Sequence, residues 1–238
     1  MASRSLWLKS GINEYTFYND LLGPIATDLK TPVAVTLSNP KVVLYGTADT
    51  PVPAGIPSRT ISIPPPLVSR FSLAENNGDP HLRYGVAHVT SEEFTGMGEA
   101  ISAFDLTRVM TALDRPVYVT QARFLNWSSV RKEHFIILGA PHLSDWTRRN
   151  IAKEDFFFVR GGIGNNNPHA GELPKYSTQF DPVSGSPTVD YGLIWMAGLP
   201  SGSRILILAG RTSAGTGGVG DFFSDPKKMR AAYERLRI

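Results

Sequence analysis

A glycine-rich string near the C-terminus is the sharpest chemical motif in this chain of 238 residues. Residues 215–220 read Gly-Thr-Gly-Gly-Val-Gly and follow an apolar strand expected over residues 205–209. A dinucleotide-binding turn needs a helix, a second strand and a later acidic residue after such a string, and too little chain remains for them. No Gly-Lys-Ser/Thr follows either, so the string is not a P-loop. Thr212, Ser213 and Thr216 then predict an anion-binding helix start or, with equal weight, glycines that pack a short helix closely.

Short polar loops follow three of the expected strands. Ser38 and Asn39 follow the strand 33–37, His142 lies in the loop after the strand 135–138, and the third loop precedes the glycine string. If these strands are parallel, all three loops leave the same edge of the sheet, where open α/β sheets bind ligands. This convergence predicts a ligand site at the carboxyl edge.

A second polar loop is expected over residues 161–187, which are rich in glycine, asparagine and proline. Asn165 and Asn167 offer donors and acceptors and tolerate a left-handed backbone, so the loop could wrap a polar ligand. The alternative is a solvent-facing connection between two strands, which the composition favours.

The sequence lacks the common motifs for catalysis and metal binding. The sequence has no G-x-S-x-G, no H-E-x-x-H and no histidine pair at ligand spacing, so we expect no metal and no cofactor. Glu99 at a helix start could act as a base, and Asp145 could orient the imidazole of His142. The alternative for either position is a helix cap or a partner of the helix dipole.

Composition excludes several classes of function. The chain has no cysteine, which removes disulfides, thiolate zinc sites, iron–sulfur clusters and thiol nucleophiles. Its net charge of +3 is a weak field over a chain of this length, so we expect no nucleic-acid partner. The basic residues form two clusters: Arg148, Arg149 and Lys153, and then Lys227, Lys228, Arg230, Arg235 and Arg237. The second cluster reads as the solvated face of a terminal helix that Asp225 and Pro226 cap.

The elements that must position these residues alternate between strands and helices. Besides the strands already named, we expect strands at 117–123, 156–159 and 193–196, and helices that start near Gly98 and near Ser144. This pattern predicts an α/β fold, with a three-layer, mainly parallel (mixed) sheet and helices on both faces, of periplasmic-binding or flavodoxin-like type.

The whole chain, residues 1–238, is predicted to be a single α/β domain. Residues 1–30 read as an N-terminal packing segment, and residues 43–80 as a long proline-rich excursion. No apolar run is long enough for a signal peptide or a membrane span, so the chain as written predicts a cytoplasmic protein without membrane contact. A chain cut downstream of an anchor would instead be extracytoplasmic.

Four stretches carry a resemblance to a known family. They are Met97-Gly98-Glu99-Ala100, the strand 135–138 with Gly139-Ala140-Pro141, the stretch from Asn167-Pro168 to Gly171-Glu172, and the segment 191–216 with its apolar strand and Gly215-Thr216. Together they resemble an uncharacterised, periplasmic-binding-like α/β module at the C-terminal end of acidobacterial proteins, often behind a DNA-binding or membrane-anchoring segment. The likeness covers roughly residues 30–225. Where that family usually carries Asn-Pro-Trp, this chain reads Ser144-Asp145-Trp146, so no asparagine role is carried over. The resemblance implies an architecture and a sensor or binding role.

The leading hypothesis is therefore a non-enzymatic domain that binds or senses a small polar or anionic molecule at the carboxyl edge. The residues expected to line the site are Ser38, Asn39, Glu99, His142, Asn165, Asn167, Thr212, Ser213 and Thr216. One alternative is a hydrolase acting on a nucleotide or ester, with Glu99 or His142 as general base. The other is a structural or partner-binding module that uses the excursion as its contact surface, and a homo-oligomer stays open.

Overall fold

The structure of the protein is a computed structural model. It describes residues 14–38, 42–46, 58–62, 86–90, 95–125, 128, 131–141, 144–183 and 185–236. The chain divides into two compact units, of which one comprises residues 1–38 and 95–238 and the other residues 39–94. The second unit is thus an insertion in the sequence of the first.

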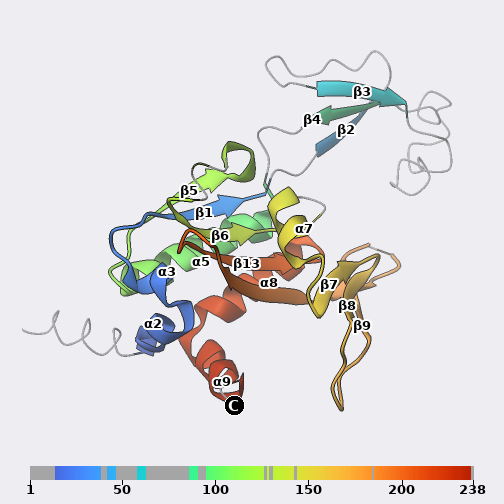
Figure 1. Ribbon diagram of the computed structural model, residues 1–238. Helices are drawn as coiled ribbons and strands as arrows, with labels where there is room; N and C mark the ends of the chain where they lie inside the picture. The colour runs from blue at the N-terminus through green and yellow to red at the C-terminus, as the bar shows by residue number, and fades with distance from the viewer. Residues whose placement is uncertain are drawn as a thin grey trace, which may run out of the picture. The chain divides into compact units, whose positions relative to one another are not determined.

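A five-stranded mixed sheet forms the centre of the first unit (Figure 1). In spatial order its strands are β12 (Gly192–Gly198), β13 (Arg204–Gly210), β6 (His134–Leu138), β1 (Val33–Leu37) and β5 (Val117–Gln121). The last four are parallel, and β12 runs antiparallel to β13. This confirms the predicted α/β class with a mainly parallel sheet. All five residues of β6 are buried, as expected for a continuous apolar run in a central strand.

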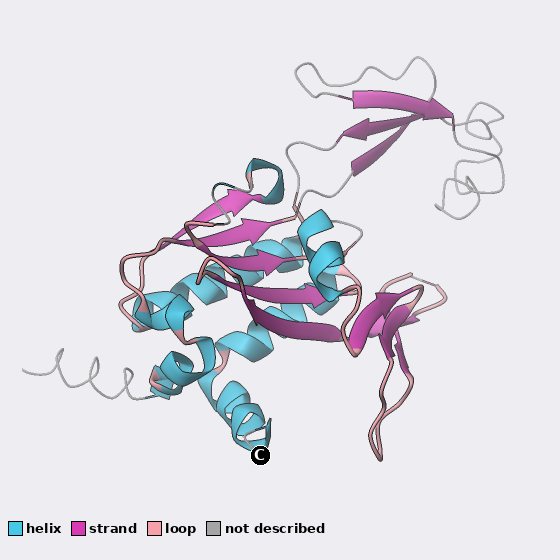
Figure 2. Ribbon diagram, viewed as in Figure 1, coloured by secondary structure: helices cyan, strands magenta, loops and turns pink. Residues whose placement is uncertain are grey.

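Helices cover both faces of this sheet, but unequally (Figure 2). One face carries α5 (Met97–Ala112) and α8 (Ser213–Ser224), together with α2 (Phe17–Leu22), α3 (Pro24–Thr27) and α9 (Pro226–Leu236). The other face carries α7 (Asp145–Ile151) and part of a small sheet. The residues of β1 alternate accordingly, with Val33 and Val35 facing the first layer and Ala34 the second.

The terminal elements agree with the sequence prediction. Tyr18, Leu22 and Ile25 are fully buried, so the described part of the N-terminal segment packs on the core as expected. At the other end, the Asp225 carboxylate accepts from the N–H groups of Lys227 and Lys228 and caps α9. Among the described residues, no helix has the length and apolar character needed to cross a membrane.

The segment 161–187 is more ordered than predicted, because it contains strands rather than a single loop. These are β8 (Gly162–Asn165), β9 (Lys175–Ser177), β10 (Gln179–Phe180) and the start of β11 (Pro187–Val189). Together β7 (Phe156–Val159), β8 and β9 form an antiparallel sheet, and β10 pairs with β11. The glycines that suggested a loop are required by close packing, since a Cβ on Gly162 would lie 2.0 Å from the Tyr176 carbonyl oxygen.

The second unit contains an antiparallel sheet in the order β2-β4-β3. Its strands are β2 (Val42–Gly46), β3 (Ser58–Ser62) and β4 (Val86–Thr90). The excursion predicted over residues 43–80 therefore includes β3 and most of β2. The rest of that range lies outside the described residues.

Helices α5 and α8 meet along a seam of glycines. A Cβ on Gly98 of α5 would lie 1.8 Å from the Ser213 carbonyl oxygen, and one on Gly220 of α8 would lie 2.0 Å from Ser102 Oγ. Ser102 Oγ donates to the carbonyl oxygens of Gly98 and Thr216, at 2.7 and 3.0 Å. The glycine string of residues 215–220 lies inside α8, so the close-packing alternative holds for it.

Candidate functional site

The carboxyl edge of the main sheet has the geometry of a ligand-binding edge. The chain passes from β1 outward to β5, whereas the later strands β6 and β13 lie on the other side of β1. This reversal places a switch point between β1 and β6, where open α/β sheets bind ligands. The loops after β1, β6 and β13 leave this one edge, as the parallel strands required.

Glu99 in the first turn of α5 joins three segments at this edge. Its side chain has 0% exposure, and Ser38 Oγ lies 2.7 Å from both carboxylate oxygens. The Ser38 N–H donates to Oε2 at 3.1 Å, and the Thr95 hydroxyl donates to the same oxygen at 2.7 Å. None of the ion pairs among the described residues involves Glu99. Among the described residues, the carboxylate is thus held by hydroxyl and amide donors.

Gly139 leaves the room that this arrangement needs. It directly follows β6 with φ +107, and a Cβ there would lie 2.7 Å from Glu99 Oε1 and 2.8 Å from Ser38 Cβ. Any other residue would therefore strain the backbone and displace the carboxylate. The structure thus brings together the expected residues Ser38 and Glu99 and the loop that follows β6.

The start of α8 is occupied by the protein's own groups. Thr212 is its N-cap, and its Oγ1 accepts from the Gly215 N–H at 3.3 Å. Asp190, which sequence reasoning missed, reaches the same point: its Oδ2 accepts from the Thr212 N–H at 3.1 Å and from the Thr212 hydroxyl at 2.7 Å. Thr216 Oγ1 accepts from the Gly210 N–H at 3.0 Å. Thr212 and Thr216 are therefore engaged in structural hydrogen bonds, and a carboxylate stands where an anion was expected.

Ser213 links the two helix starts. Its Oγ accepts from the Gly98 N–H at 2.9 Å, and a Cβ on Gly96 would lie 2.9 Å from it. Ser213 therefore lies beside the first turn of α5, near Glu99 and its donors.

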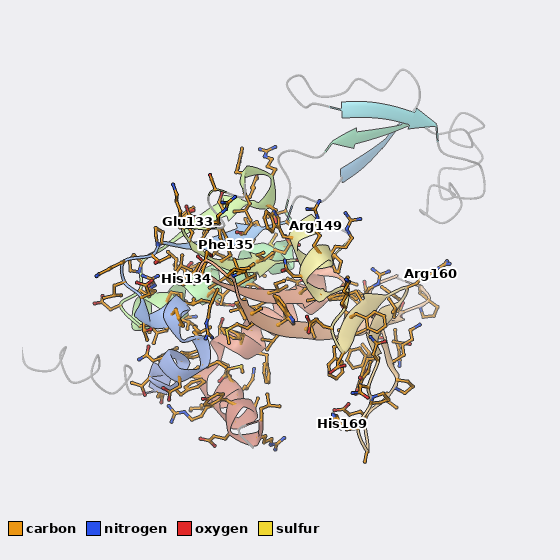
Figure 3. The ribbon with its side chains drawn as sticks, in the orientation of Figure 1. Glu133, His134, Phe135, Arg149, Arg160 and His169 are labelled. Atoms are coloured by element: carbon orange, nitrogen blue, oxygen red, sulfur yellow. The ribbon has the colours of Figure 1, made fainter. Side chains whose placement is uncertain are left out.

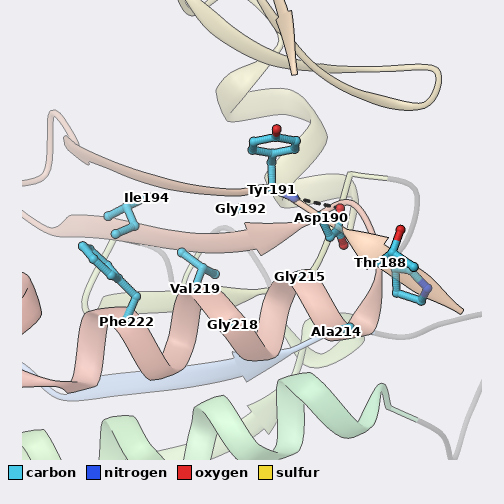
Figure 4. Close-up of a pocket in the computed structure, with 11 residues that line it drawn as sticks. Thr188, Asp190, Tyr191, Gly192, Ile194, Ala214, Gly215, Gly218, Val219 and Phe222 are labelled. Atoms are coloured by element: carbon cyan, nitrogen blue, oxygen red, sulfur yellow. Dashed lines mark hydrogen bonds between the residues drawn. The ribbon is translucent and has the colours of Figure 1, made fainter. Parts of the chain in front are cut away.

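A pocket of about 640 Å³ opens between β12 and α8 (Figure 4). Its lining residues are Pro187, Thr188, Asp190, Tyr191, Gly192, Ile194, Ala214, Gly215, Gly218, Val219 and Phe222. Asp190 lies at the start of α8, while Ile194, Val219 and Phe222 bring apolar side chains together further along the helix. Gly218 leaves space, because a Cβ there would meet nothing within 4 Å. The pocket thus has one acidic end and one apolar end.

Asp190 is fixed at its end of the pocket by four hydrogen bonds. In addition to the two from Thr212, Oδ1 accepts from the Thr178 hydroxyl and from the Tyr191 N–H, each at 2.9 Å. A Cβ on Gly215 would lie 2.3 Å from Oδ2, so glycine is needed for the carboxylate to pack on α8. The sequence signal that could have found Asp190 is its position just before an apolar strand, but Thr178 and Thr212, its two partners besides the neighbouring Tyr191, lie on two other segments.

Asn165 and Asn167 do not join this site. Asn165 Nδ2 donates to Glu172 Oε2 at 2.8 Å, and Asn165 Oδ1 accepts from the Asn167 N–H at 3.0 Å. Glu172 also accepts from the His169 N–H, and these bonds hold its pKa below the ordinary value. These contacts are internal to the loop after β8, so they support its structure.

Two expected site residues, Asn39 and His142, lie outside the described residues, as does the side chain of Asp145. Across the part of the chain that the structure describes, no group of three or more histidine, aspartate or glutamate side chains could hold a metal ion.

A separate polar cluster lies at the amino ends of the strands. Figure 3 labels one of its residues, His134, apart from Arg149 and Arg160. His134 is buried, and its Nδ1 accepts from the Arg204 N–H at 2.9 Å. Burial lowers the pKa of His134, and the charges of Arg115 and Arg204 act in the same direction, against Asp28. The buried guanidinium of Arg115 donates to the carbonyl oxygens of Ile25 and Thr31. These contacts join the N-terminal segment to the sheet and face no pocket described above.

Comparison with known proteins adds no further constraint. No family model, curated protein or solved structure matches this chain. The site must therefore be interpreted from its own geometry.

Proposed function

We propose that the protein is a binding domain for a small molecule, which it holds in the pocket between β12 and α8. The observation that carries this proposal is the pocket itself. Its volume of about 640 Å³ lies within the range of small-molecule sites, and it combines apolar walls with a few fixed polar groups. The pocket lies against the edge strand β12, with β13 between β12 and the switch-point strand β6, so its volume and lining carry the proposal.

The proposal retains the small-molecule role expected from the sequence but changes the expected lining. None of the nine residues expected to line the site is among the described residues that line the pocket. The pocket uses Asp190, Ile194 and Phe222, and α8 contributes its open glycine face. The periplasmic-binding-like or flavodoxin-like type, and the likeness to the acidobacterial module, remain proposals that are compatible with the mainly parallel sheet.

The hydrolase alternative has less support. Glu99 has 0% exposure and accepts from Ser38 and Thr95, so its carboxylate is directed at the protein and not at a substrate. The other proposed base, His142, lies outside the described residues. The partner-binding alternative used residues 43–80, and only β2 and β3 are described there.

A ligand-observed NMR screen with a library of small aromatic amines, alcohols and carboxylates tests the proposal. Hits should compete with one another for one site, and Gly218→Leu should abolish their binding, because a side chain on Gly218 enters the open space of the pocket. Gly218→Leu should also fold, since leucine favours a helix more than glycine does.

Gly198→Leu is the matched control. Gly198 is at the far end of β12, outside the pocket lining, and a Cβ there also meets nothing within 4 Å. The control should bind the hits as the unmodified protein does. Hits that bind Gly218→Leu unchanged, or a library without hits, would overturn the proposed function.

A further inference from the structure

We infer that the pocket between β12 and α8 takes an organic cation with an apolar body, in which the charge lies beside Asp190 and the body lies against Ile194 and Phe222. This inference rests on the proposed function and names the chemical class of its ligand.

The charge of the pocket supports a cation. Among the described residues that line the pocket, Asp190 is the one ionisable residue apart from the Tyr191 phenol, and none is a lysine, arginine or histidine. None of the ion pairs among the described residues involves Asp190. The described lining therefore carries a negative charge without a basic side chain to balance it, which attracts a cation and repels an anion.

The start of α8 does not offer the usual site for an anion. The Thr212 N–H donates to Asp190, and the Gly215 N–H donates to Thr212 Oγ1. A helix start binds anions through N–H groups of this kind, and here a carboxylate already takes up that position. The anionic ligand predicted from the glycine string is thus disfavoured in this pocket.

The hydrogen bonds of Asp190 indicate which kinds of cation the pocket can bind. A carboxylate has about four acceptor positions, and the two donors of Thr212, the Thr178 hydroxyl and the Tyr191 N–H supply four hydrogen bonds. A ligand is then attracted by the charge of Asp190 rather than by a new hydrogen bond to it. A quaternary ammonium, which has no N–H, should bind as well as a primary amine.

The spacing along α8 sets the length of the ligand. Gly215, on which Asp190 packs, and Phe222 are seven positions apart, which is about 10 Å along a helix axis. A phenyl ring and an ammonium group joined by a butyl chain fit this span, with the ring near Phe222 and Ile194 (Figure 4).

Isothermal titration calorimetry with four matched probes tests the inference: phenylbutylamine, phenylbutyltrimethylammonium, phenylbutanol and phenylbutyrate. We expect both cations to bind about tenfold or more tightly than phenylbutanol, equivalent to about 1.4 kcal/mol, and phenylbutyrate to bind most weakly. The preference for cations should decrease as salt is added, because the pocket is open to solvent.

Two variants separate the effect of the Asp190 charge on ligand binding from the effect of the hydrogen bonds that hold Asp190. Asp190→Asn should reduce the preference for cations over phenylbutanol to less than about threefold, while phenylbutanol still binds. Thr178→Val should leave cation binding intact and favour the primary amine over the quaternary one, because it frees an acceptor position on Asp190.

The outcomes distinguish this inference from the proposed function. If all four probes bind equally and Gly218→Leu blocks them, the pocket is a binding site but its ligand is not a cation. If phenylbutyrate binds most tightly, the inference is likewise wrong. If no probe binds and the library screen gives no hits, both the inference and the proposed function fail.

Discussion

At the carboxyl edge, removing the side chain of Glu99 should lower the free energy of unfolding the most. Its buried carboxylate accepts from the Ser38 N–H and from the hydroxyls of Ser38 and Thr95. Glu99→Ala leaves these donors without a partner and opens a cavity, so we expect a loss of about 3 kcal/mol in the free energy of unfolding. Glu99→Gln keeps an acceptor and should cost about 1 kcal/mol. Urea denaturation measures both.

Glu234→Ala on the exposed face of α9 serves as the control for this comparison. It removes the same side chain where no buried partner depends on it, and should change stability by less than about 0.5 kcal/mol. Equal losses for Glu99→Ala and Glu234→Ala would contradict the role of the buried carboxylate.

His134 should make the stability of the protein depend on pH. Its pKa is lowered in the folded state, because burial disfavours the imidazolium, and Nδ1 must stay unprotonated to accept from the Arg204 N–H. The unfolded chain, with a histidine pKa of about 6.5, then binds more protons. The contribution of His134 is therefore full above about pH 6.5 and is lost as the pH falls below it.

Urea denaturation from about pH 7.5 to about pH 5 measures this dependence. His134→Asn, whose side-chain oxygen can replace Nδ1 as acceptor, should flatten the slope of stability against pH. His169→Asn, on an exposed loop, should leave the slope unchanged. An unaltered slope in His134→Asn would mean that other groups cause the pH dependence.

At the scale of elements, the glycine seam should tolerate no side chain on the α5 side. Gly98→Ala places a Cβ 1.8 Å from the Ser213 carbonyl oxygen, so α5 and α8 must separate, and we expect a loss of about 3 kcal/mol or more. Gly218→Ala on the open face of α8 should instead stabilise by about 0.5 kcal/mol, because alanine favours the helix. Thermal unfolding followed by circular dichroism compares the two variants. Similar effects of both would contradict the close approach of the helices.

Local patterns predicted most of these elements well. The bounds of β1 and β7 coincide with the apolar runs at 33–37 and 156–159. The alternation of strands and helices favours a parallel arrangement, and the structure has this arrangement in β13, β6, β1 and β5.

The elements that sequence reasoning missed depend on contacts between distant segments. β8 reads Gly-Ile-Gly-Asn, a loop composition, and becomes a strand only because β7 and β9 approach its glycines closely. Asp190 likewise acquires its role from Thr178 and Thr212, neither of which is near it in the sequence. No local pattern carries this information.

At the scale of the whole molecule, the first unit should fold without the second. Ser38 and Thr95 are the residues at which the chain leaves and re-enters the first unit, and both donate to the Glu99 carboxylate. A short Gly-Ser linker can therefore replace residues 39–94, because the two ends are already held together and closing a short flexible loop costs little. We expect the shortened protein to unfold cooperatively in urea.

The shortened protein should also retain the pocket ligands, since β12 and α8 belong wholly to the first unit. A protein that loses its cooperative transition would show that the first unit depends on residues 39–94. If Glu99 holds the closed ends together, combining the replacement of residues 39–94 with Glu99→Ala should lower the free energy of unfolding by more than the sum of the two separate losses.

The shared carboxylate also bears on how such a chain could change over evolutionary time. Because one glutamate fixes both points where the insertion joins the first unit, the fold of that unit places almost no demand on the length or content of what lies between them. Relatives of this protein should therefore differ most between Ser38 and Thr95, where whole modules can be exchanged, while an acidic residue and its two hydroxyl donors are retained at the junction.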